Sequence, residues 1–143
     1  MGLFGNLFSD KTPEYPQLDA QSPTGRKLAA VQQELQELAQ KVSQPLEVVP
    51  TDHAAYVFIG KPPKKFGLAW IHDGKVSGLN TLIEEHGVSP AEIEKVLGSL
   101  REAYARHQDA QHFTARLDER KVVVTASKAL EQEVHEIIDR IVH

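Results

Sequence analysis

The pattern that most constrains the fold lies in residues 53–79. The runs AAYVFIG and KFGLAWI are rich in aromatic and β-branched side chains, and Asp73-Gly74 separates the second run from KVSGL. Such runs favour strands, and Asp-Gly between two of them is a strong signal for a two-residue hairpin turn. The segment therefore predicts three antiparallel strands, at about residues 53–60, 65–72 and 75–79.

Patterns on either side of this segment complete the predicted fold. Apolar residues recur at spacings of three and four from Thr24 to Val42, which predicts an amphipathic helix, and Pro45 and Pro50 bracket a short extended piece, LEVV. FTARLD and VVVTA predict a second hairpin, and a last helix begins at about Lys128. We expect an α+β fold in which an antiparallel sheet of about five strands, in two hairpin units, is packed by three main helices.

The first residues differ in composition from the rest of the chain. Pro13, Pro16 and Pro23 stand among Ser, Asp, Thr and Gln, a composition that resists both helix and sheet. The chain of 143 residues lies in the usual range for one domain. We therefore expect a flexible N-terminal arm at residues 1–23 and a single α+β domain at residues 24–143.

An apolar group opens this predicted arm. Four side chains stand at helical spacing, as in a short tether to a membrane or to a partner: Leu3, Phe4, Leu7 and Phe8. The alternative is a frayed or self-docked leader. No run approaches the roughly 18 apolar residues of a membrane helix, so the sequence predicts no integral membrane segment and a cytoplasmic location.

Composition excludes several classes of function. Cysteine is absent, which removes disulfides, thiolate nucleophiles and cysteine-bound metals. The net charge is −4, so no overall basic field attracts nucleic acid. None of the common hydrolase, zinc-protease, nucleotide or dinucleotide motifs is present. A non-enzymatic protein without a cofactor is therefore favoured.

Histidines and carboxylates are the remaining candidates for a metal site. The best spacings are His107 with His112, and the i+4 row of Glu131, His135 and Asp139 on the last predicted helix. A row on one helix provides no converging ligand from another element, and such a row is more often a solvated face. We therefore predict no metal site.

Residues 81–97 suggest DNA binding. Gly87-Val88-Ser89, followed by Ala91 and spaced aliphatic residues, resembles the turn and recognition helix of lac-repressor-like regulators. That resemblance implies a DNA-binding regulator. However, four carboxylates would face the phosphate backbone and repel it: Glu84, Glu85, Glu92 and Glu94. A Gly cap, a Ser N-cap and a following Pro are also what any tight junction between two helices uses.

Period-two alternation separates the strands of residues 53–72 into two faces. One face carries small and aliphatic residues: Ala55, Val57, Ile59, Gly67, Ala69 and Ile71. The other carries Tyr56, Phe58, Phe66, Leu68, Trp70 and His72, including four of the nine aromatic residues of the chain. The adjoining loop holds the densest positive charge in the sequence: Lys61, Lys64 and Lys65.

Two interpretations of the aromatic face lead to different functions. If helices cover both faces, the aromatic residues are core. If one face stays partly open, Trp70 and Tyr56 anchor a protein partner or a second copy of the chain, and the three lysines form an orienting rim. The sequence favours a small interaction or regulatory module that uses the aromatic face of residues 53–79. The alternatives are the DNA-binding regulator and a small-ligand sensor with a pocket between sheet and helices.

Overall fold

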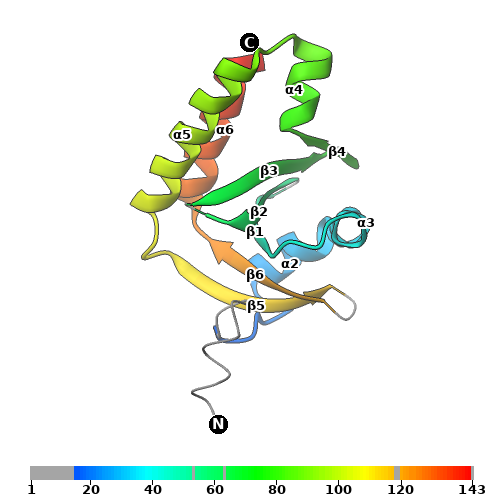
Figure 1. Cartoon of the computed structure of the whole chain (residues 1–143). Helices are drawn as coiled ribbons and strands as arrows, with labels where there is room; N and C mark the ends of the chain where they lie inside the picture. The colour runs from blue at the N-terminus through cyan, green and yellow to red at the C-terminus, as the bar shows by residue number, and fades with distance from the viewer. Residues whose placement is uncertain (1–14, 53, 63, 118–119, 143) are drawn as a thin grey trace.

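The computed structural model describes residues 15–52, 54–62, 64–117 and 120–142. Six strands form one mixed sheet in the order β4-β3-β2-β1-β6-β5, with helices on both faces (Figure 1). The strands are β1 (Leu46–Pro50), β2 (Ala54–Lys61), β3 (Lys65–His72), β4 (Lys75–Gly78), β5 (Gln111–Leu117) and β6 (Arg120–Ala126). The α+β class and both predicted hairpins are therefore confirmed.

The prediction of a five-stranded antiparallel sheet was wrong, because the piece LEVV is itself a strand. β1 pairs antiparallel with β2 and parallel with β6, so it joins the two hairpins into one sheet. All five of its residues are buried. A central strand covered on both faces has a mainly apolar sequence instead of an alternating one, and apart from Glu47 the residues of β1 are apolar, which is why the alternation pattern did not reveal it.

Five helices are described, in place of the three main helices expected: α2 (Pro23–Ala30), α3 (Gln32–Lys41), α4 (Leu79–His86), α5 (Pro90–Arg106) and α6 (Lys128–Val142). The predicted helix from Thr24 to Val42 is interrupted at Val31, whose φ of −119° lies outside the helical range. The two helices run in different directions (Figure 1), and Leu28, Val31 and Leu35 are buried in the core on this face of the sheet. The apolar stripe packs within this chain.

The two faces of the sheet carry separate cores. Helices α2 and α3 cover one face, where the small and aliphatic residues of β2 and β3 are buried, including Ala55, Val57 and Ile71. Helices α5 and α6 cover the opposite face, where Tyr56 and Phe58 are buried. The division of β2 and β3 into two faces is therefore confirmed.

The junction between α4 and α5 uses the predicted capping residues. Gly87 ends α4 in the left-handed conformation with φ 66°, which glycine adopts without strain. The Ser89 hydroxyl accepts a hydrogen bond from the backbone N–H of Glu92 at 3.2 Å, and Glu92 reaches back to the N–H of Ser89. At its other end, α4 begins directly after β4, with Gly78 as its N-cap.

A buried hydrogen-bond network connects α5 to the middle of the sheet. The Glu47 side chain of β1 accepts hydrogen bonds from the hydroxyls of Tyr104 at 2.8 Å and Thr125 at 2.6 Å. His112 lies next to Thr125, with 2.9 Å between Nδ1 and Oγ1. Burial, and secondarily the neighbouring Glu47, raise the pKa of Tyr104, so its hydroxyl keeps the proton that it donates.

Residues 15–22 are the described part of the predicted N-terminal arm, and they lie against β5 (Figure 1). The N–H of Leu18 donates to the carbonyl of Thr114, and the N–H of Thr114 donates to the carbonyl of Pro16, each at 2.8 Å. Gln17 and Thr114 form a parallel bridge. This segment therefore provides hydrogen-bond partners for the outward-facing backbone N–H and C=O groups of Thr114 on β5.

Candidate functional site

The aromatic face of the β2–β3 hairpin is mainly core. Tyr56 is 9% exposed and Phe58 is fully buried. The Phe58 ring lies 5.3 Å from that of Tyr104 on α5 and 5.7 Å from that of Phe66. The interpretation in which helices cover this face therefore holds for Tyr56 and Phe58, and neither presents a large surface to a partner. The burial of Tyr56 and Phe58 results from packing against α5 and α6, which lie far from β2 in the sequence.

The remaining residues predicted for the site are more exposed. Phe66 and Trp70 are half-buried and pack against the edge of the α5–α6 core, whereas His72 is exposed. The Arg101 guanidinium lies 5.8 Å from the centre of the Phe66 ring. Lys61, Lys64 and Lys65 are exposed around the loop between β2 and β3, where Lys61 is paired in register with Lys65. The exposed part of the predicted site therefore lies toward the start of β3.

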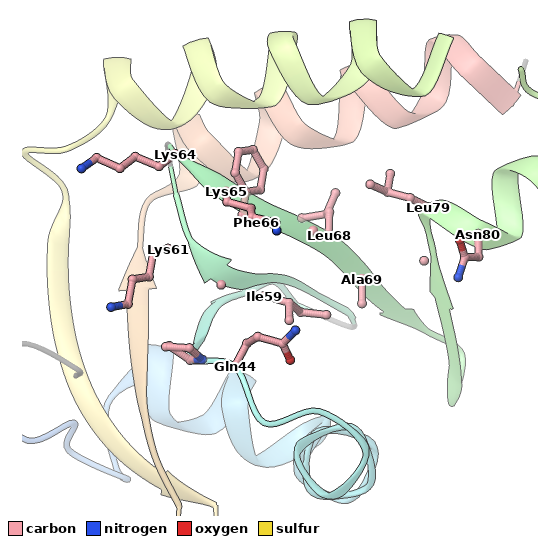
Figure 2. A pocket seen from close by; sticks show the side chains of 14 residues that line it. Gln44, Ile59, Lys61, Lys64, Lys65, Phe66, Leu68, Ala69, Leu79 and Asn80 are labelled. Carbon is pink, nitrogen blue, oxygen red and sulfur yellow. The ribbon is translucent and has the colours of Figure 1, made fainter. Parts of the chain in front are cut away.

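A groove of about 860 Å³ lies beside this part of β3. Figure 2 shows Phe66 and Leu68 directed toward α5 and Ala69 directed to the opposite side of the strand, so the groove follows the edge of the sheet. Leu79 and Asn80 at the start of α4 close one end, and the lysines lie at the other (Figure 2). The described residues that line the groove include three lysines and no Asp or Glu.

The backbone of β3 is exposed along this groove. Asp73 and Gly74 form the turn between β3 and β4 with φ of 52° and 74°, as in a type I′ hairpin. In such a hairpin the flanking pair, His72 and Lys75, exchanges both backbone hydrogen bonds, and every second residue does the same. The N–H and C=O groups of residues 66, 68, 70 and 72 therefore point to the outer side of β3.

β4 pairs with only half of that outer side. Its last residue, Gly78, lies opposite Ala69, and α4 begins at the next residue. Within the described part of the chain, no strand pairs with the outer side of residues 65–68. In the same alternation Leu79 lies opposite Leu68, so the carbonyl of Leu68 is directed at the end of β4. The N–H groups of Phe66 and Leu68 and the carbonyl of Phe66 face the groove, where a further extended chain would find two donors and one acceptor.

Gly67 widens the groove. A Cβ atom placed on this residue would meet no heavy atom within 4 Å, although the residue sits in the middle of a strand. The first atom of a side chain there would therefore enter open space on the groove side of the strand. Sequence reasoning did not include Gly67, Leu79 or Asn80 in the site. A glycine inside a strand pattern was the available signal, since it often marks a place where another backbone approaches.

A second hollow, of about 450 Å³, lies at the opposite end of the hairpin, where α6 begins. Tyr56 reaches it with its hydroxyl, which lies 3.0 Å from Nδ1 of His135. Burial, with smaller contributions from Glu131 and Asp139, raises the pKa of Tyr56 to about 12. The phenol is therefore protonated at neutral pH and has the role of a structural hydrogen-bond partner.

His107 and His112, which the sequence pairs as metal-ligand candidates, each contact a side chain of this chain. His107 and Arg106 at the end of α5 both pair with Glu133 of α6, and His112 lies in the network of Glu47 and Thr125. Among the residues that the structure describes, no group of three or more His, Asp or Glu side chains is placed to hold a metal ion. The histidine contacts therefore connect elements of the fold.

In segment 81–97, the residues that resemble a DNA-binding turn and helix have structural roles. Gly87 and Ser89 are capping residues, and Val88 is buried, with its N–H bonded to the carbonyl of Leu82 at 3.1 Å. All four carboxylates of the segment are exposed: Glu84, Glu85, Glu92 and Glu94. An exposed acidic surface opposes binding to phosphates.

Two further predictions concern membranes. The apolar group of Leu3, Phe4, Leu7 and Phe8 lies outside the described residues. In the described part of the chain, no helix is both long enough and apolar enough to cross a bilayer.

Comparisons of the chain with protein-family models, with curated proteins and with solved structures found no match. The groove and the β3 edge are therefore the features of this molecule from which a function is inferred.

Proposed function

We propose that the protein is a non-enzymatic interaction module that binds an extended segment of a protein partner along the open edge of β3. The observation that carries the proposal is the outward-facing backbone of Phe66 and Leu68 inside an apolar groove. A peptide that adds a strand to a sheet gains affinity from main-chain hydrogen bonds and specificity from pockets for its alternate side chains.

The shape of the groove supports a strand as the bound form. Its lining comes from both faces of the sheet, with Phe66 and Leu68 on one side and Ile59 and Ala69 on the other. Successive side chains of a bound strand would point to these two sides in turn. The small-ligand alternative leaves the backbone donors and acceptors of β3 unexplained.

A second copy of the chain fits this edge less well than a free segment. The outer side of β3 is open only over residues 65–68, and β4 occupies the continuation. If two copies paired through this edge, the β4 strand of each would stand next to the pairing site of the other. Lysine at a sheet edge also discourages pairing between identical edges. An unstructured segment of another protein avoids both obstacles.

The proposal revises the site predicted from sequence. Phe66 and the three lysines remain in it, whereas Trp70 and His72 lie where β4 already pairs with β3. Tyr56 and Phe58 support β2 from the core. Gly67, Leu68, Leu79 and Asn80 are added.

The variant Gly67→Val tests the proposal. The Cβ of valine would meet no heavy atom within 4 Å, and its methyl groups would occupy part of the groove. We expect stability to stay unchanged or to rise by about 0.5–1 kcal/mol, because glycine weakens a strand. Peptides selected from a displayed random library on the native protein are labelled with fluorescein and titrated by fluorescence anisotropy. We expect at least about tenfold weaker binding to Gly67→Val, which corresponds to about 1.4 kcal/mol.

Gly98→Ala is the matched control. Gly98 lies on α5 outside the groove, and a Cβ there would also meet nothing within 4 Å. It should bind the peptides as the native protein does. Equal binding of the selected peptides to Gly67→Val, or self-association of the native protein that Gly67→Val abolishes, would overturn the proposal of a partner segment. Selection of no peptide would also count against it.

A further inference from the structure

We infer that the bound segment runs antiparallel to β3 and carries acidic side chains toward its C-terminal end, where it meets Lys61, Lys64 and Lys65. This inference rests on the proposed function and adds the direction and the charge of the partner segment. It follows from the direction of β3, from the position of the lysines and from the space at Gly67.

The direction follows from the neighbouring strands. β3 is antiparallel to β2 on one side and to β4 on the other. β4 runs toward the start of β3 but leaves the sheet at Gly78. An added antiparallel segment would continue that path beyond Leu79, opposite Gly67 first and Lys65 last. Antiparallel pairing is also slightly more stable per residue than parallel pairing.

The charge follows from the two ends of the groove. An antiparallel segment has its C-terminal end at the lysines and its N-terminal end at α4. The three ammonium groups carry more positive charge than the N-terminus of α4, since a helix N-terminus carries only about half an elementary charge. Because no described Asp or Glu lines the groove, carboxylates of the partner would complement the ammonium groups of Lys64 and Lys65.

The size of one partner side chain follows from Gly67. In an antiparallel pair, side chains directly opposite each other lie on the same face and contact one another. The partner residue opposite Gly67 faces open space near Ile59 and Ala69. A large apolar side chain at this position would cover the glycine, as large residues do when they pack over glycine in paired strands.

Four synthetic peptides test the charge. All share one core of alternating Val and Thr with a central Phe, and all are acetylated and amidated so that only side chains carry charge. The first peptide has three Asp at its C-terminal end, and the second has three Asp at its N-terminal end. The third has three Lys at its C-terminal end, and the fourth has three Ser at its C-terminal end. We expect the first to bind at least about tenfold more tightly than the other three at low salt, and less so at high salt.

The double variant Lys64→Gln/Lys65→Gln should remove most of the preference for C-terminal Asp, while the Ser peptide binds it as it binds the native protein. Equal binding of all four peptides to the native protein would overturn the charge inference and leave strand capture standing. If none of the four bound, and library selection also gave no groove-dependent peptide, the proposed function itself would fail.

A spin label tests the direction independently of charge. A nitroxide at the C-terminal end of the Ser peptide should broaden the amide NMR signals of Lys64 and Lys65 and spare that of Asn80. Moving the label to the N-terminal end should reverse the pattern. Broadening of Asn80 by the C-terminal label would show a parallel segment and overturn the inferred direction.

Discussion

At one edge of the sheet, β5 exchanges backbone hydrogen bonds with residues 16–18, whereas at the other edge β3 has no strand partner over residues 65–68 in the described chain. Both edges expose main-chain donors and acceptors, yet among the described residues an extended segment covers only the edge at β5. The contacts at β5 show that this sheet accommodates an extended chain at its edge. The groove at β3 has the corresponding backbone groups and, in addition, an apolar lining and three lysines.

Thr114→Pro should have the largest effect on this comparison, because it would open the covered edge. The substitution removes the backbone N–H that donates to Pro16 and the hydroxyl that donates to the carbonyl of Tyr15. Each net hydrogen bond contributes about 0.5–1.5 kcal/mol, so we expect a loss of about 1–3 kcal/mol in the free energy of unfolding. Chemical denaturation measures it.

Thr114→Ala is the control for this variant. It keeps the backbone N–H and removes only the hydroxyl, so it should cost less than Thr114→Pro. If the two variants were equally stable, the backbone contact between residues 16–18 and β5 would contribute nothing, and the contrast between the two edges would lose its energetic basis.

A smaller effect is expected for Ser89→Ala at the junction between α4 and α5. The lost N-cap should lower the free energy of unfolding by about 1 kcal/mol. Because Ser89 lies outside the groove, peptide affinity should not change. This variant therefore separates stability from binding. An unchanged denaturation midpoint would contradict the role of Ser89 as a cap, and weaker peptide binding would connect the groove to the stability of α5.

Local sequence patterns predicted the elements of the fold better than their assembly. The turn at Asp73-Gly74, the cap at Ser89 and the two faces of β2 and β3 depend on neighbouring residues, and all were predicted. The role of β1 depends on pairing with β6, which lies more than 70 residues further along the chain. No local pattern reports such a parallel pairing.

The candidate site shows the same division. The lysines and Phe66 were recognised from local charge and alternation. The burial of Tyr56 and Phe58 depends on α5 and α6, and the open edge depends on where β4 ends. Gly67 was the only local sign of the groove, because a glycine inside a strand often marks a place where a ligand or another backbone approaches closely.

Amide hydrogen exchange of β3, followed by NMR, tests the central claim most directly. In the free protein, the outward amides of Phe66 and Leu68 should exchange rapidly, while those of Gly67 and Ala69, which face β2, and that of Leu18 at the covered edge should be protected. A bound peptide with C-terminal Asp should slow Phe66 and Leu68 on the order of tenfold or more. Protection of both amides in the free protein, or no change when the peptide binds, would contradict the account.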